Sequence, residues 1–255
     1  MNHIKYAFSK FSFWFSWFAT IIGVVTILDL SKLVRIIIVL GCFLFSFIIP
    51  FISSFIKKNF EIHTIGKSKV ALSFGDLFDE ECFLVTTNLY FDVNPTGEYI
   101  SEDSLLGNFV RKFFPNNVAE LEEKIRCELQ KHENNITPTN YGKTIRINLD
   151  EKIIYFMAFT DRRKTNQPED FYIKAVQSFL KEIINENHGK TICIPLLGNN
   201  NNLSNSGFSD SKISLLSFVS MINYFEIINQ RSQLNIKIIA LPEERSNLLD
   251  IIAKI

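Results

Sequence analysis

Two long hydrophobic runs lie back to back at the start of the sequence, and only four residues separate them. The first run, residues 11–28, has no charged residue, and the second, residues 33–56, has only Arg35. A helix rises ~1.5 Å per residue and a bilayer core is ~30 Å thick, so about 20 apolar residues cross it. The runs therefore predict a transmembrane hairpin, followed by a domain that is held at a membrane surface.

Two other interpretations of these runs stay open. The first run could be a cleaved signal peptide, although no small-residue cleavage pattern follows it, or the pair could be a buried hairpin of a soluble protein. The outer flanks of the hairpin carry four basic residues, whereas Lys32 and Arg35 lie near the connection. The positive-inside rule then predicts a multi-pass protein of the cell membrane with both termini in the cytoplasm. The flanking residues are Lys5, Lys10, Lys57 and Lys58.

Charge and cysteine usage exclude several functions for the rest of the chain. Residues 1–60 have a net charge of +5, and residues 61–255 have 21 basic and 26 acidic residues, a net charge of −5. An acidic domain is a poor candidate for binding nucleic acid, so we expect no such partner. The four cysteines and four histidines lack metal-ligand spacing, which predicts no metal site and free thiols in a reducing compartment.

From residue 69 onward, segments typical of strands alternate with amphipathic segments typical of helices. This pattern predicts a single α/β domain over residues 61–255, behind a hairpin over residues 1–60. The predicted strands are residues 70–74, 82–87, 144–149, 153–159, 191–195 and 236–241. The predicted helices are residues 104–114, 118–129, 172–184 and 209–229, with a last helix that begins at Pro242.

Three predicted strands end in residues that can bind a ligand, and open α/β sheets bind ligands beyond the carboxyl ends of their strands. Asp76, in Gly75-Asp76-Leu77, could accept a hydrogen bond from adenine N6, and Asn88 could bond a ribose or an amide. The third end is Pro195-Leu196-Leu197-Gly198, followed by an Asn-rich loop and Ser206-Gly207-Phe208 before a helix. Such a loop can bind phosphate through backbone N–H groups. Each motif alone is also typical of an ordinary turn or cap.

The order of these three motifs resembles that of macro domains, which bind ADP-ribose, over about residues 69–255. This resemblance implies a three-layer α/β/α domain with a mixed sheet and an ADP-ribose-type nucleotide as the ligand. It also implies that Asp76 recognises adenine and that the diphosphate lies along Gly198, Asn199, Ser206 and Gly207. The other residues that we assign to this predicted site are Leu77, Asn88, Gly107, Leu197 and Phe208.

Two departures from the macro pattern bear on catalysis. Hydrolytic macro domains usually have an Asn-Ala-Ala-Asn-like run and a Gly-rich loop, where this chain has Thr87-Asn88-Leu89-Tyr90 and Ser104-Leu105-Leu106-Gly107-Asn108. We therefore expect a binding protein without catalytic residues. A membrane-tethered ADP-ribosyl hydrolase is the alternative, and a plain structural anchor is a third interpretation. Residues 161–164, at another strand end, could contact a second group of the ligand or form a solvated turn.

Two predicted spans followed by a divergent macro domain resemble the membrane-anchored effector of Thoeris antiphage defence. In that family a TIR-domain partner consumes NAD and makes an ADP-ribose-based signal. For this type of effector the resemblance implies a conjugate of ADP-ribose with histidine as the signal. It further implies that the macro domain senses this signal and that the effector then forms homo-oligomers and disrupts the lipid bilayer, which causes abortive infection.

Overall fold

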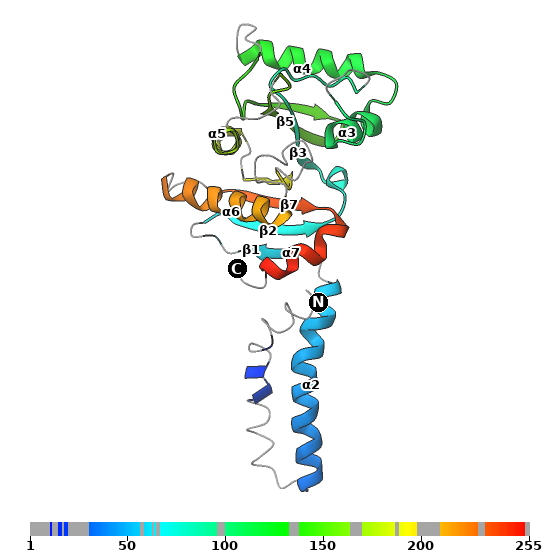
Figure 1. Ribbon diagram of the computed structural model, residues 1–255, viewed down its shortest axis with the longest axis vertical. Coiled ribbons are helices and arrows are strands. Elements are labelled where there is room, and N and C mark those ends of the chain that lie inside the picture. Colours follow the sequence, from blue (N-terminus) through cyan, green and yellow to red (C-terminus); the bar gives the residue numbers. More distant parts are fainter. Residues whose placement is uncertain are drawn as a thin grey trace. The chain divides into compact units, whose positions relative to one another are not determined.

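The computed structural model in Figure 1 describes residues 11, 15–16, 18–19, 31–56, 59–62, 64, 67–95, 100–132, 138–163, 170–186, 189–197, 210–228 and 233–252. Nearly all of the predicted elements are confirmed to within a few residues. The elements are α2 (Lys32–Ile56), β1 (Asn59–Ile62), β2 (Lys69–Phe74), η1 (Leu77–Asp79), β3 (Cys82–Asn88), α3 (Leu105–Phe113), α4 (Val118–His132), β4 (Thr144–Leu149), β5 (Lys152–Thr160), α5 (Phe171–Glu186), β6 (Thr191–Pro195), α6 (Ser211–Ile228), β7 (Asn235–Ala240), η3 (Pro242–Glu244) and α7 (Arg245–Ile252).

The chain divides into two compact units. The first is Met1–Ile62 together with Pro242–Ile255, and the second is His63–Leu241. The first unit therefore contains α2, β1, η3 and α7, and the second contains the other described elements. The predicted division into residues 1–60 and residues 61–255 stays a prediction.

The long helix of the first unit is α2, which covers the whole second hydrophobic run in 25 residues. Most of the first run lies outside the described residues, but Phe11 and Phe15 are helical and stack on each other. Both rings pack edge-on against Phe43 of α2, with centroids 5.6 and 6.4 Å away. A two-helix hairpin is thus not established by these residues and stays a prediction.

Among the described residues, one helix is long and apolar enough to cross a membrane, and it is α6 of the second unit. However, 44% of α6 is buried inside the protein, and core helices of soluble proteins meet the same criterion. A shorter apolar helical stretch, Ile36–Ser46, lies within α2. Helix length and composition alone are therefore weak support for a membrane span.

The sheet of the second unit is mixed, as predicted. Among the described residues of this unit, the strands lie in the order β2-β7-β6-β3-β5-β4. All neighbours are parallel except β4, which pairs antiparallel with β5 through a tight turn at Asp150. Asp150 has a φ of +50°, which an aspartate tolerates better than most residues. An antiparallel edge strand on an otherwise parallel sheet is common among α/β domains.

Helices cover both faces of this sheet. Alternate residues of a strand point to opposite faces, and in the buried strands both sets of side chains pack against helices. On β5, Ile154, Phe156 and Ala158 belong to the core that includes α3, α4 and η1. Phe159, on the opposite face, packs its ring against Phe171 and Tyr172 of α5. The helices α5 and α6 also contact each other. The second unit is therefore a three-layer α/β/α domain (Figure 1).

Candidate functional site

The strands that precede the three predicted ligand-binding segments, β2, β3 and β6, end along one edge of the sheet. Phe74 at the end of β2 pairs with Ala240, and Pro195 at the end of β6 pairs with Ile239 of the same strand β7. At the end of β3, Asn88 pairs with Thr160 of β5. Because these strands are parallel, their carboxyl ends share an edge, as the sequence predicts. The ends of β2 and β3 are three strand spacings apart, or ~14 Å at ~4.8 Å each.

Asp76 lies at one end of this row and caps the short helix η1. Its Oδ1 accepts a hydrogen bond from the backbone N–H of Phe78 at 2.9 Å. Its Oδ2 lies 2.9 Å from Nζ of Lys112, in the last turn of α3. Nζ of Lys112 is also 3.6 Å from Oδ1 of Asp79. The side chain of Asp76 is 49% exposed, so its carboxylate is oriented by the fold and still accessible to a ligand.

The environment of Asp76 favours its charged form. Partial burial raises the pKa of this carboxyl group, but the hydrogen bond from Phe78 and the ammonium group of Lys112 outweigh burial and lower it below the usual 3.8. Conversely, the hydrogen bond to Asp76 raises the pKa of Lys112 above its usual value. Asp76 is therefore an ionised acceptor at neutral pH, which suits recognition of an exocyclic amine.

Asn88, at the other end of the row, organises the loop that follows β3. Only 6% of Asn88 is exposed. Its Oδ1 accepts hydrogen bonds from the backbone N–H groups of Tyr90 (2.9 Å) and Asp92 (3.3 Å), and its Nδ2 donates to Oδ2 of Asp92 at 2.9 Å. Asn88 therefore shapes the loop through both ends of its amide. The role of Asn88 in binding a ligand stays a prediction.

The loop after Asn88 is held in one conformation from several sides. The backbone N–H of Leu89 donates to Thr160 O, and Thr139 donates to Leu89 O through its backbone N–H (2.8 Å) and its hydroxyl (2.9 Å). Phe91 has a φ of +53°, an uncommon value for a bulky residue, and its side chain is buried. Strained conformations of this kind persist only where the surroundings impose them, and they cluster at functional sites.

Gly107 has a packing role that explains why this position is a glycine. It lies in the first turn of α3, where its N–H donates to Oγ of the capping residue Ser104 at 3.0 Å. A Cβ at this position would lie 2.4 Å from Ser101 O and 2.6 Å from Glu102 O. The missing side chain therefore lets α3 pack against the preceding turn. This finding accounts for Gly107 without a ligand, and contact with a ligand stays a prediction.

The remaining predicted residues are either buried or outside the described part of the chain. Leu77 and Leu197 are 6% and 3% exposed, so their side chains pack in the interior of the domain beside these strand ends. The predicted phosphate-binding residues Gly198, Asn199, Ser206 and Gly207, and also Phe208, fall within residues 198–209, outside the described residues. Among the described residues, no group of three His, Cys, Asp or Glu side chains could hold a metal ion.

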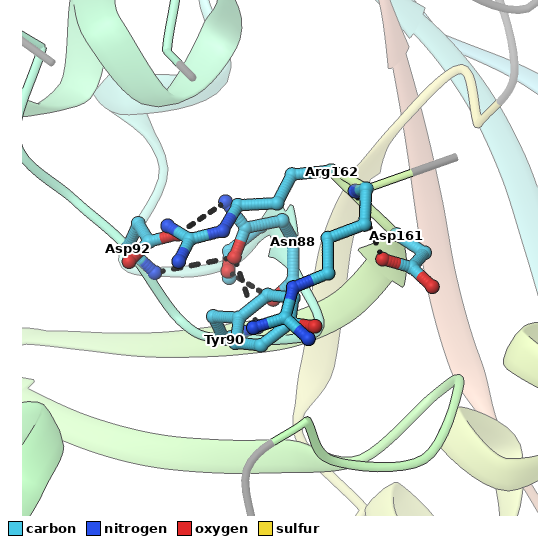
Figure 2. Close-up of polar contacts among 7 residues, drawn as sticks. Asn88, Tyr90, Asp92, Asp161 and Arg162 are labelled. Atoms are coloured by element: carbon cyan, nitrogen blue, oxygen red, sulfur yellow. Dashed lines mark hydrogen bonds and ion pairs between the residues drawn. The ribbon is translucent and has the colours of Figure 1, made fainter. Parts of the chain in front are cut away.

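The structure adds residues to the site that the sequence analysis did not assign. Lys112 contacts Asp76, although it follows it by 36 positions, and no local pattern signals this contact. At the other end of the row, Arg162 forms an ion pair with Asp92 (Figure 2). The guanidinium groups of Arg162 and Arg163 both lie over the ring of Tyr90. The Asn88-x-Tyr90-x-Asp92 spacing is the one signal that could have indicated a structured loop here.

This three-layer domain with a mixed sheet has the macro-domain fold, as comparison with solved structures shows. A mutant of the macrodomain of Oceanobacillus iheyensis is 13% identical to this chain, with a TM-score of 0.51 over 77% of this chain and 92% of that chain. A second mutant of that macrodomain, with ADPR, is 14% identical, with a TM-score of 0.50 over 77% and 97%. The same macrodomain with ADP is 13% identical, with a TM-score of 0.50 over 77% and 95%. Such low identities show the fold alone.

The family follows from the sequence model that matches residues 70–240, described as "Thoeris protein ThsA, Macro domain". The chain belongs to this family. No curated protein sequence matches it.

Proposed function

We propose that this protein is a membrane effector of antiphage defence that senses an ADP-ribose-derived signal through its macro domain. The observation that carries the proposal is the ionised, half-exposed carboxylate of Asp76 beside β2, in a domain of the Thoeris ThsA macro family. The structure of a related macrodomain with ADPR, which is ADP-ribose, supports the same class of ligand. In this proposal a TIR-domain partner makes the signal, such as histidine-ADP-ribose.

The proposed membrane contact is supported by the side chains of α2. At ~1.5 Å per residue, its 25 residues extend about 37 Å, more than the ~30 Å core of a bilayer. The buried hydroxyl of Ser46 bonds to Cys42 O within the helix at 2.7 Å. The large apolar side chains that α2 exposes are Val34, Ile36, Ile37, Val39, Leu40, Phe43, Leu44, Phe45, Ile48 and Ile52.

The N-terminal segment would then act as the output of the signal. Two aromatic rings of the first run contact Phe43 of α2, which supports a paired hairpin over a single anchor helix. When the macro domain binds its ligand, hairpins from several copies would associate and disrupt the bilayer, because the ligand favours the associated state. A passive anchor would need only one span.

The test compares full-length protein in lipid vesicles with and without the candidate nucleotides. ADP-ribose or histidine-ADP-ribose should raise the melting temperature of the protein and release a trapped dye from the vesicles. A chimera with residues 1–60 replaced by an unrelated two-span hairpin should bind the ligand but release no dye. If the chimera releases dye equally well, the spans have no specific function.

The alternative, a membrane-tethered ADP-ribosyl hydrolase, is distinguished by its product. A hydrolase would release free ADP-ribose from modified substrates, whereas a sensor would bind and return its ligand unchanged. The internal hydrogen bonds of Asn88 favour the sensor, because they commit the amide to shaping the loop. Release of free ADP-ribose at many turnovers per protein molecule would establish the hydrolase.

A further inference from the structure

Helix α6, drawn in orange in Figure 1, exposes an apolar face along its length. Five large apolar side chains of this helix are 43–60% exposed: Ile213, Leu216, Tyr224, Ile227 and Ile228. Within α6, all of which the structure describes, the only charged residues are Lys212 and Glu226. Lys212 is half-buried and Glu226 is buried, so the exposed residues of α6 carry no charge. Single exposed apolar residues are ordinary, but a continuous apolar face marks an interaction site.

The exposed residues of α6 are arranged symmetrically about Ser220, which is itself exposed. Leu216 and Tyr224 lie four positions from Ser220, and Ile213 and Ile227 lie seven positions from it. Spacings of four and seven keep side chains on one face of a helix. If a second copy of α6 packs antiparallel across this face with two-fold symmetry at Ser220, Ile213 of each copy faces Ile227 of the other. By the same symmetry Leu216 faces Tyr224. The face is therefore complementary to itself, with a small residue where the helices cross and large residues on both sides.

Charge favours a second copy over a lipid surface as the partner of this face. Residues 61–255 have 21 basic and 26 acidic residues, a net charge of −5, so the anionic surface of a membrane repels this domain. Helices that lie on membranes usually carry Lys or Arg beside their apolar face, whereas the exposed residues of α6 carry neither. Two uncharged faces can bury each other without removing any charge from water.

The size of the face indicates a weak contact. The 18 residues of α6 extend ~27 Å at ~1.5 Å each, and a helix is ~10 Å wide, so one face presents roughly 300 Å². A stable complex buries about 800 Å² on each partner. Pairing through α6 therefore requires a high local concentration, which attachment of several copies to one membrane supplies.

We propose that two copies of this protein associate through α6, packed antiparallel with Ser220 at the crossing point. Ile213 of each copy then contacts Ile227 of the other. This inference rests on the proposed function for the membrane attachment that concentrates the copies. It names the surface of the macro domain through which the copies pair.

The experiment measures cross-linking of the full-length protein in lipid vesicles. Ser220→Cys is combined with Cys127→Ser, which removes the exposed native thiol of α4. A short bismaleimide should join two such chains into a covalent dimer, because the two-fold symmetry brings the new thiols together. The matched control is Glu122→Cys in the same background, which places an exposed thiol on α4. It should form about tenfold less dimer, since only chance encounters join these thiols.

Charge variants test the register of the pairing. Ile227→Lys or Ile213→Glu alone should reduce cross-linking through Ser220→Cys by about tenfold or more, because each buries an unpaired charge. The double variant should restore cross-linking, since each new carboxylate then faces a new ammonium group of the other copy. Gln130→Lys adds the same charge at an exposed position of α4 and should have no effect. Ile227→Lys should still bind ADP-ribose with unchanged affinity, because it lies at the end of α6 farther from the predicted phosphate-binding loop.

Failure of this inference is distinct from failure of the proposed function. If Ser220→Cys and Glu122→Cys cross-link equally, or if the double variant cross-links as little as the single variants, α6 does not pair with itself. A lipid surface or another protein then covers its face, and the sensor proposal stands as long as ADP-ribose raises the melting temperature. If α6 pairs but no ADP-ribose-type nucleotide binds, the proposed function fails and this interface stands.

Discussion

Nζ of Lys112 and Oδ2 of Asp76 lie 2.9 Å apart, although 36 positions separate the two residues in the sequence. This ion pair joins the last turn of α3 to the segment after β2, at the point where we propose that adenine binds. The same ammonium group lies over the rings of Phe78 and Phe113, 5.4 and 6.0 Å from their centroids. Lys112 thus fixes the orientation of the carboxylate that we propose recognises the ligand.

Replacing Asp76 tests the adenine contact directly. Asp76→Ala should weaken binding of ADP-ribose by about 1.5–3 kcal/mol, roughly ten- to 150-fold, because a hydrogen bond to a charged acceptor is lost. The matched control is Asp79→Ala, because Asp79 also lies near Lys112 and its side chain is 77% exposed. Isothermal titration calorimetry of the full-length protein in detergent measures the affinity of both variants for ADP-ribose. Equal losses for the two variants would remove Asp76 from the site.

The Lys112–Asp76 pair should make a small, pH-dependent contribution to stability. Because the pKa of Asp76 is lower in the folded state, the pair stabilises the fold above the unfolded value of 3.8, and this contribution is lost as the pH falls through the folded pKa. Both side chains are nearly half exposed, so Lys112→Met should destabilise the protein by less than about 1 kcal/mol at pH 7.

The measurement compares the melting temperatures of the wild-type protein and of Lys112→Met from pH 7 down to ~3. The difference between the two melting temperatures should shrink steadily as the pH falls below the ordinary pKa of an aspartate. A difference that stays constant across this range would mean that Lys112 acts through packing on the phenylalanine rings and not through charge.

Gly75 and Gly107 should respond oppositely to the same substitution. Gly107→Ala places a Cβ 2.4 Å from a backbone oxygen, so we expect a loss of about 1–3 kcal/mol of stability, as is usual for overpacking. At Gly75 a Cβ meets no atom within 4 Å, so Gly75→Ala should be neutral or slightly stabilising. Thermal unfolding of both variants measures this contrast, and a stable Gly107→Ala variant that fails to bind ADP-ribose would instead make Gly107 a ligand contact.

The cysteines of the macro domain should differ in reactivity. Burial raises the pKa of Cys82 to about 11 and, with the nearby Glu80 carboxylate, that of Cys193 to about 12. Cys127 is exposed on α4, and its hydrogen bond to Glu123 raises its pKa. Iodoacetamide at pH 8 should therefore modify Cys127 first, and Cys82 and Cys193 only after unfolding. Peptide mass spectrometry reports each site, and early labelling of Cys193 would contradict the burial argument.

A charged residue in the middle of α2 separates a membrane span from an exposed helix in water. Leu44 lies at the centre of α2 and is 57% exposed. If α2 crosses the bilayer, Leu44→Arg should oppose insertion by about 2.5–3.5 kcal/mol, whereas Val34→Arg, near the start of the helix, should be tolerated. Carbonate extraction of cell membranes shows how much of each variant is inserted. Full retention of Leu44→Arg would argue against a span.

The macro domain was predictable to a large extent because its signals are local. Alternating strands and helices, the Ser104 cap and the turn at Asp150 follow from residues close together in the sequence. The shared edge of the three motifs followed as well, because parallel strands bring their carboxyl ends to the same side. The roles of Asn88 and Gly107 did not follow, since both depend on backbone groups whose positions are fixed only by the folded loop.

By itself, then, the sequence determined the order of the elements, the α/β class of the domain and the edge of the sheet on which polar loops gather. It did so because hydrophobic period and capping residues act over a few positions. Only the tertiary structure decided which charges meet there: Lys112 with Asp76 and Arg162 with Asp92. Electrostatic contacts depend on distance in space, and in this fold residues 36 and 70 positions apart become neighbours because packing, not local sequence, brings their strands and helices together.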